Sequence, residues 1–172
     1  MATTYTLISS VTVGSGGAAN IEFTSIPSTY TDLIIKMSLR SSNTGNIAKR
    51  TGIRFNGAST DANLSTSLAY GDGSITGGFT TSTGFTAWMP DGSATASGFS
   101  NIEVYITNYA GSNNKPFSID GVMENNATAA YGGLFVGLWS DSSAINSIKI
   151  FEVDANNLVQ YSTAYLYGIS NA

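Results

Sequence analysis

Alternation of apolar and polar side chains is the strongest pattern in this chain. In the stretch TDLIIKMSLR, residues 31–40, every second side chain from Leu33 onward is apolar. A repeat of two residues places alternate side chains on opposite faces of a β-strand. The stretch therefore predicts a half-buried strand with one face in a hydrophobic core. The core side chains predicted for it are Leu33, Ile35, Met37 and Leu39.

Eight further stretches show a similar pattern, so about nine strands are predicted. Clusters of Gly, Asn, Ser and Asp, such as NTGN, NGAST, AGSNN and DANN, separate them and favour turns. Together they indicate an all-β sandwich or barrel. The apolar positions that mark these stretches are Tyr5, Leu7, Val11 and Val13; Ile21 and Phe23; Ile53 and Phe55; Ile102, Val104 and Ile106; Phe117 and Ile119; Leu134, Val136 and Leu138; Ile148 and Ile150; and Leu166.

Two regions depart from this pattern. Residues 61–71, DANLSTSLAYG, could hold one or two helical turns after an Asp cap. Residues 71–98 are dominated by Gly, Ser and Thr, interrupted by Ile75, Phe79, Phe85 and Trp88. They fit either a long loop or an irregular hairpin through FTAWMP, residues 85–90. The length of 172 residues fits one domain, and no linker divides residues 1–172.

Charge is unusually sparse, because only 10% of the residues are charged, against about a quarter in typical soluble proteins. The exterior should therefore be polar but uncharged, or covered by neighbouring molecules in an assembly. A net charge of −4 argues against a nucleic-acid binder, which needs a basic surface. Five of the seven basic residues fall within residues 36–54, which fits solvated strand edges better than a basic patch.

The candidate chemistry is limited, because the chain contains neither His nor Cys. Ser-His-Asp and Cys-His catalysis are thereby excluded, as are disulfides and thiolate metal sites. Ser147 and Lys149 are two residues apart on one strand, which is ordinary strand alternation. The segment DANN, residues 154–157, lacks the spacing of a calcium loop, and GSGG, residues 14–17, lacks the lysine of a phosphate loop. We expect a protein that is not an enzyme and has no catalytic residues, cofactor or metal.

The beginning of the chain, MATTYTLISSVTVGSGG, has neither the basic segment nor the apolar segment of a signal peptide. No stretch of the chain approaches the apolar length of a membrane span. We therefore expect a protein that is made and kept soluble in a reducing cytoplasm, with no membrane partner.

Aromatic residues in the Gly, Ser and Thr-rich segment are candidates for binding. Tyr and Trp side chains on a sandwich stack on sugar rings, and no alternation assigns Trp88 to the core. The alternative is that Trp88 anchors this segment onto the sandwich. Trp139 ends an apolar run and is predicted to be packed. The residues selected as a partner- or glycan-binding group are Phe85, Trp88 and Met89.

Several segments resemble small virion structural proteins of tailed bacteriophages, particularly marine and cyanobacterial phages. The most specific are IPSTYTDL at residues 26–33, WSDSSAINSI at residues 139–148 and AYLYGI at residues 164–169, and the likeness extends over nearly the whole chain. The segment at residues 71–98 has no counterpart in this resemblance.

The resemblance implies a jelly-roll-like β-sandwich that assembles as a homotrimer in the virion and binds the major capsid protein or another virion protein. It has no catalytic residues to transfer. A capsid decoration or cement protein is the first expectation. The alternatives are a tail, horn or fibre component that binds host surface glycan through Phe85, Trp88 and Met89, and a free carbohydrate-binding module.

Overall fold

The fold consists of antiparallel β-strands. The computed structural model describes residues 4–74, 76–124 and 130–170, and Ile75 lies outside this part. Within it there is no helix that could span a membrane. The twelve strands are β1 (Tyr5–Thr12), β2 (Asn20–Phe23), β3 (Asp32–Ser38), β4 (Ala48–Phe55), β5 (Leu64–Gly71), β6 (Thr76–Thr81), β7 (Phe85–Pro90), β8 (Asn101–Ile106), β9 (Lys115–Glu124), β10 (Ala130–Trp139), β11 (Ile148–Glu152) and β12 (Thr163–Ile169).

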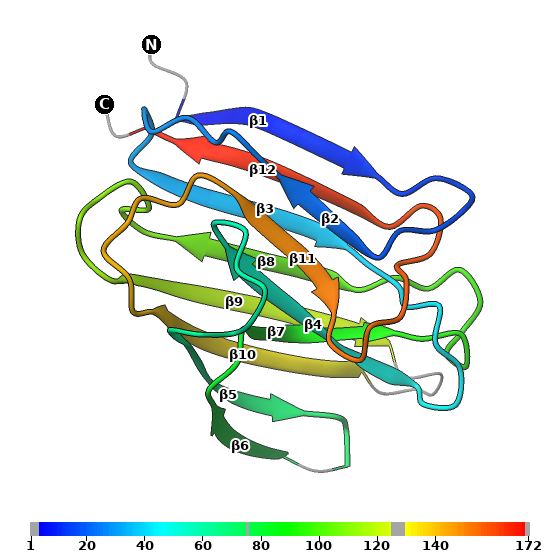
Figure 1. The fold of residues 1–172 in the computed structure, drawn as a ribbon. Helices are drawn as coiled ribbons and strands as arrows, with labels where there is room; N and C mark the ends of the chain where they lie inside the picture. Colours follow the sequence, from blue (N-terminus) through cyan, green and yellow to red (C-terminus); the bar gives the residue numbers. More distant parts are fainter. Residues whose placement is uncertain (1–3, 75, 125–129, 171–172) are drawn as a thin grey trace.

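The strands form two sheets that pack face to face (Figure 1). The larger sheet has eight strands in the order β1-β12-β3-β8-β9-β10-β5-β6, and the smaller has four in the order β2-β11-β4-β7. The predicted all-β sandwich, folded as a single domain, is confirmed.

The strand order is that of a jelly roll. Four antiparallel pairs are nested along the chain: β1 with β12, β2 with β11, β3 with β8, and β4 with β7. In a jelly roll these four pairs lie alternately in two packed sheets, so that each sheet receives four of the eight strands. Here one set is β1-β12-β3-β8 and the other is β2-β11-β4-β7. Two hairpins, β5–β6 and β9–β10, are inserted into it, and both extend the larger sheet.

The hydrophobic core lies between the sheets and contains most of the side chains that alternation predicts. In β3, Leu33 and Ile35 are completely buried, and Val104 of β8, which is paired with Ile35, is buried as well. From the smaller sheet, Ile53 and Ile150 lie directly opposite each other and pack against this surface. Period-two alternation is therefore sufficient to identify the inner face of the central strands.

The two regions without clear alternation also form strands. Residues 64–71 are β5 instead of the predicted helical turns, because Leu64, Thr66 and Leu68 alternate inward along an extended chain. Residues 76–81 and 85–90 form β6 and β7, which belong to different sheets. The segment therefore crosses from one sheet to the other, and it is neither a long loop nor a hairpin through residues 85–90.

Two stretches turn their apolar residues away from the core, contrary to the simplest interpretation of the alternation. In β10, Leu134 and Val136 are 67% and 61% exposed, whereas Phe135 points inward. In β1, Tyr5 and Leu7 are about half exposed, because a β-bulge between Leu7 and Ser9 reverses which residues face inward. The extra residue restores Val11 and Val13 to the inner side.

Aromatic rings cover glycines at several positions of the sheets. Phe117 lies directly opposite Gly137, Tyr70 opposite Gly77 and Phe151 opposite Gly52. At Gly77 and Gly52 a Cβ atom would come within 3.0 Å and 2.6 Å of the opposing ring, and at Gly137 it would overlap the ring. An aromatic side chain packed over a cross-strand glycine compensates for the missing side chain. At each of these glycines the space above the backbone is filled by the opposing ring, so a methyl group in its place would collide with that ring.

This packing makes a testable distinction between two glycines of β10. Gly137→Ala should lower the free energy of unfolding by about 1–3 kcal/mol, because the methyl group must displace the Phe117 ring. Gly132→Ala is the matched control: its methyl group would meet no atom within 4 Å, so the change should stay within about 0.5 kcal/mol. Urea denaturation of both variants measures the difference, and equal effects would contradict the ring-on-glycine packing.

Candidate functional site

The structure separates the three residues predicted as a binding group. Phe85 and Met89 point into the core and are 3% and 0% exposed, so neither side chain is available to a ligand. Trp88 lies between them in β7 and is half-buried. The prediction is therefore wrong for Phe85 and Met89, because β7 is a sandwich strand whose alternate side chains fill the core. Trp139, predicted to be packed, is buried.

Trp88 belongs to a cluster of aromatic rings at one side of the sandwich. Its ring centroid lies 5.2 Å from that of Phe85, 5.3 Å from Tyr70 and 5.5 Å from Phe135. Tyr131 and Phe79 complete the aromatic cluster at the periphery, and Phe79 is 46% exposed. Trp88 thus anchors its segment to the rest of the fold, which is the structural alternative considered from the sequence.

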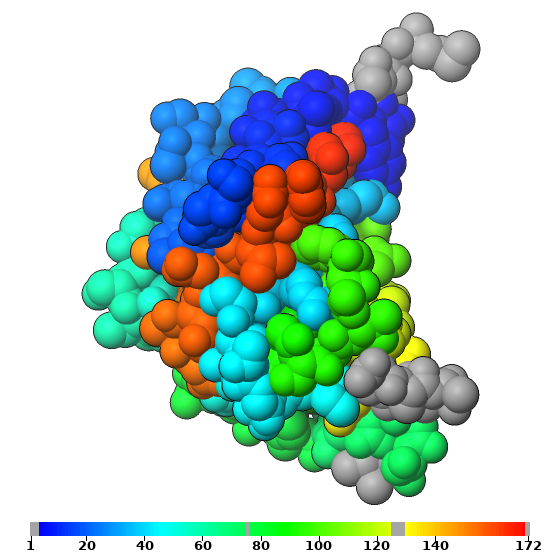
Figure 2. All heavy atoms as spheres, turned by 90° about the vertical axis from the view of Figure 1, so that its right-hand side faces the viewer, coloured from blue at the N-terminus to red at the C-terminus, as the bar shows by residue number. Residues whose placement is uncertain are grey.

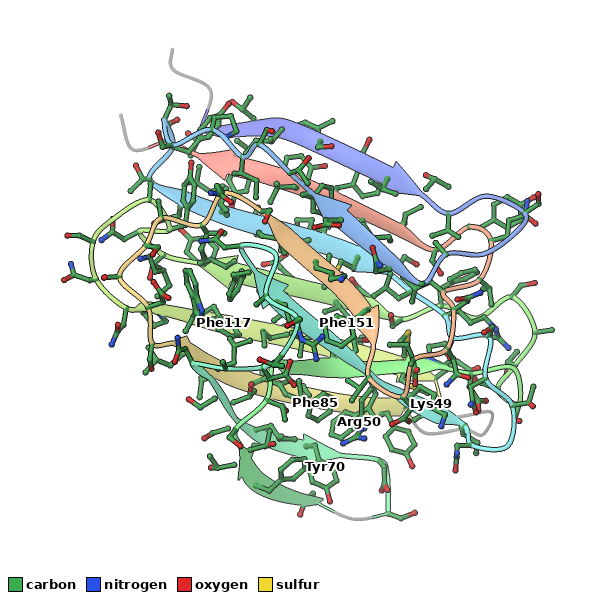
Figure 3. All side chains as sticks on the ribbon, viewed as in Figure 1. Lys49, Arg50, Tyr70, Phe85, Phe117 and Phe151 are labelled. Carbon is green, nitrogen blue, oxygen red and sulfur yellow. The ribbon has the colours of Figure 1, made fainter. Side chains whose placement is uncertain are left out.

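The aromatic cluster lies where the smaller sheet ends and the larger one continues. The edge strand β7 packs against β9 and β10, whereas β5 and β6 extend beyond it (Figure 1). Figure 3 shows Tyr70 on this projecting hairpin and Phe85 on the adjacent β7. The rings close the core along the uncovered inner side of the larger sheet.

A candidate contact surface is the other side of the larger sheet, which faces away from the smaller sheet and is called the outer face below. At its centre, Val122 of β9 and Leu134 and Val136 of β10 form an apolar patch. Exposed apolar groups that are contiguous on a sheet often mark interaction surfaces. The continuous run LFV at residues 134–136 was the available signal, because a strand that is apolar at successive positions has apolar groups on both faces.

Two hollows lie beside the apolar patch. One of about 470 Å³ is lined by Ala69, Gly71, Asp120, Val122, Gly132 and Leu134, among others. The second, of about 260 Å³, lies between Tyr105, Pro116, Phe117 and Val136. Glycines make the first hollow by leaving backbone exposed, and a Cβ at Gly132 would meet only open space. The outer face therefore has two hollows into which side chains of a partner can fit.

Charged side chains lie beside the apolar patch on the outer face. Lys36 of β3 contacts Glu103 of β8 at 2.6 Å. The Tyr105 hydroxyl donates a hydrogen bond of 2.7 Å to Asp32, whose second oxygen accepts one from the backbone N–H of Asn108. The ion pair is exposed and contributes little energy. The hydrogen bond from the neutral Tyr105 hydroxyl leaves the charge of Asp32 in place, so a partner surface would meet the negative charge of Asp32 and Asp120 beside the apolar patch.

The basic residues near positions 36–54 do not form one patch. Lys36 is on the outer face, while Arg40 is buried and donates to the carbonyl groups of Thr95 and Gly98, both at 2.8 Å. The remaining three pair with carboxylates: Lys49 and Arg50 with Asp154, and Arg54 with Asp61. The structure provides no basic surface here for a polyanion.

Buried ionisable groups have structural partners. Asp91 accepts from the N–H groups of Asn46 and Ser93, and Glu152 accepts from the Asn156 N–H. Together with Arg40, these groups fasten the loops that gather at the end of the sandwich seen in Figure 2. Loops that are fixed in this way hold the ends of the two sheets together.

At the opposite end, Lys115 is completely buried and donates to the carbonyl groups of Asp141 and Ser143 at 3.2 and 2.5 Å. Burial lowers the pKa of Lys115, an effect opposed by the charge of Asp141. The lysine fixes the loop between β10 and β11. Among the described residues no group of three or more acidic residues is placed to hold a metal ion.

The aromatic cluster predicts that Trp88 is needed for stability. Trp88→Ala should lower the free energy of unfolding by about 2–4 kcal/mol, because several neighbouring rings lose their contacts. Leu134→Ala is the control, since its exposed side chain should change stability by less than about 0.5 kcal/mol. Thermal and urea unfolding measure both, and an unchanged Trp88→Ala variant would show that the cluster does not support the core.

The hydrogen bond to Asp32, followed by burial and the Asp32 charge, raises the pKa of Tyr105 from 10.0 to about 12. Because the folded pKa exceeds the unfolded one, this stabilisation is complete below pH 10 and is lost as pH rises through about 12. Absorbance titration of the phenolate should show an ionisation step near pH 12 that disappears in Tyr105→Phe. In Asp32→Asn the Tyr105 step should move to lower pH, and an unchanged step would contradict this assignment.

Compared with known proteins, the chain matches no protein-family model, no curated protein and no solved structure. Its function must therefore be inferred from its own surface chemistry.

Proposed function

We propose that this chain is a non-enzymatic structural protein of a bacteriophage virion that decorates or cements the capsid shell. Its partner would be the major capsid protein or another virion protein, and its place the virion, after assembly in the host cytoplasm. The resemblance of IPSTYTDL, WSDSSAINSI and AYLYGI to small phage virion proteins supports the class.

The observation that carries this proposal is the apolar patch on the outer face. Leu134 and Val136 lie in an inner strand of the larger sheet and are more than 60% exposed, although adjacent strands provide polar positions such as Ser118 and Ser67. Burying such groups against a partner stabilises a complex by about 25 cal/mol for each Å² of apolar surface. A patch with this location fits a protein that functions in permanent contact with other subunits.

Two further features favour an assembly protein over an enzyme. Charged residues make up 10% of the chain, so identical copies can pack closely without strong repulsion. The buried ionisable groups described above hold loops in place through hydrogen bonds to backbone groups. Closed homo-oligomers are the usual form of such proteins, and the resemblance favours a homotrimer.

A tail, horn or fibre component that binds host glycan is the second candidate. The half-buried Trp88, beside Tyr131 and the exposed Phe79, offers aromatic ring surface on which a sugar could stack. The burial of Phe85 and Met89 weakens this candidate, and a free carbohydrate-binding module rests on the same rings alone. Copy number separates the two virion roles: hundreds of copies per particle indicate decoration, and about a dozen indicate the tail.

Sedimentation with phage capsids that lack the protein tests the proposal. The wild-type chain should co-sediment at a fixed ratio to the capsid subunits. Val136→Asp should bind at least about tenfold more weakly, because it places a charge in the centre of the contact. Thr24→Asp, an exposed change just after β2 of the smaller sheet, is the matched control and should bind normally.

Two results would contradict the proposal. Wild-type protein that stays in the supernatant at all ratios would remove capsid binding. Equal binding by Val136→Asp and the wild type would remove the outer face from the contact, even if the capsid is the partner.

A further inference from the structure

We infer that the edge strand β6 adds to β6 of a second copy of this chain, so that the eight-stranded sheets of two molecules continue into each other. The contact depends on the backbone of β6 and on its side-chain pattern. It is independent of capsid binding, which the outer face would mediate.

Strand β6 is an unprotected sheet edge. Its sequence TGGFTT contains neither a charged residue nor proline, and all its residues except Thr81 are exposed. It pairs with β5 on one side and ends the eight-stranded sheet on the other, so one row of its backbone N–H and C=O groups is directed away from the sheet. Such an edge is a template for another extended strand.

The other sheet edges carry features that oppose strand addition. The β-bulge between Leu7 and Ser9 interrupts β1. Strand β2 has only four residues, one of which is Glu22. Strand β7 ends in Pro90, and proline removes a backbone donor. Bulges, short length, charge and proline are the usual protections of an edge, and β6 alone among these four strands lacks them.

The side chains of β6 favour a second copy as the added strand. In a sheet continued through a two-fold axis perpendicular to it, residues opposite each other must lie on the same face. An antiparallel register centred on Gly78 places Phe79 of each copy opposite Gly77 of the other, and Thr76 opposite Thr80. Aromatic residues already lie opposite glycines in this molecule, as Phe117 does opposite Gly137.

The same register gives Phe79 an aromatic neighbour. A Cβ at Gly77 would lie 3.0 Å from the Tyr70 ring, so this ring covers the glycine. Phe79 of the second copy, placed opposite Gly77, would lie beside that ring. Phe79 is 46% exposed in the isolated chain, and the contact would bury its remaining apolar surface.

Electrostatics does not oppose the pairing. The nearest acidic residue along the chain is Asp72, in the turn that precedes β6. Gly71 pairs with Thr76 within one chain, so Asp72 lies beyond the end of β6, and an antiparallel pairing places the two copies' turns at opposite ends of the paired strands. Identical charged edges would repel each other, whereas this edge can approach its own copy.

A charge-pair experiment tests both the contact and its register. Sedimentation velocity and light scattering should detect dimers of the wild-type chain at up to about 100 µM, where even a weak contact is populated. A variant with both Thr76→Lys and Thr80→Lys should dimerise about tenfold more weakly, because like charges then face each other twice. A variant with Thr76→Lys and Thr80→Glu should regain wild-type dimerisation, since opposite charges then meet.

Controls keep the result specific. Within one chain Thr76 and Thr80 lie opposite Gly71 and Ser67, so neither added charge faces a charged residue in its own sheet. A Ser10→Lys and Thr12→Lys double variant places the same charge on β1, at the far edge of the sheet, and should dimerise normally. Circular dichroism and thermal unfolding verify that every variant is folded.

A wild-type chain that forms no two-fold dimer at the highest concentration, whether it is monomeric or trimeric, would overturn the inference. So would a dimer that the two lysines on β6 leave unchanged, which would move the contact to another surface. These measurements use the purified chain alone. Absence of the β6 dimer would therefore leave the proposal of capsid binding through the outer face standing, and absence of capsid binding would leave the β6 dimer standing.

Discussion

The two sheets of this sandwich differ in width, and the other features of the molecule follow from that difference. Four strands cover eight, so the inner side of the larger sheet is protected only as far as β7 reaches. A jelly roll without inserted hairpins would have equal sheets. The hairpins β5–β6 and β9–β10 break this equality, and Tyr70, Phe85, Trp88 and Phe135 close the core where the smaller sheet ends. The projecting part leaves β6 as a free edge and widens the outer face.

The composition of the chain suits this architecture. Glycine is frequent, with 19 residues, and at Gly137, Gly77 and Gly52 it makes room for a ring on the opposite strand. Glycine in a strand destabilises the fold through its conformational entropy, and the packing of the opposing aromatic ring offsets this cost. Elsewhere, as at Gly132, glycine leaves a hollow in the outer face. The pairs at Gly137 and Gly77 lie on the inner side of the larger sheet, whereas the Phe151 ring covers Gly52 on the outer side of the smaller one.

Alternation in the sequence is sufficient to predict the central strands and their inward side chains, such as Ile35 and Val104. It fails where both faces of a strand are apolar, because Leu134, Phe135 and Val136 give no indication of which face is buried. It also fails for Tyr5 and Leu7, since one extra residue in a bulge reverses the faces. The choice of Phe85, Trp88 and Met89 assumed an exposed segment, whereas β7 pairs with β4 and buries two of the three. Long-range pairing of this kind leaves no local signal.

We propose that the outer face of the larger sheet is the surface through which the protein joins its assembly. Because the chain has no cysteine, a single Val136→Cys variant carries one unique label site, and Glu22→Cys provides its counterpart on the smaller sheet. Maleimide labelling should modify both variants in the free protein. In assembled particles, labelling at position 136 should be lost while labelling at position 22 persists. Persistent labelling at position 136 with protection at position 22 would place the contact on the smaller sheet instead of the outer face.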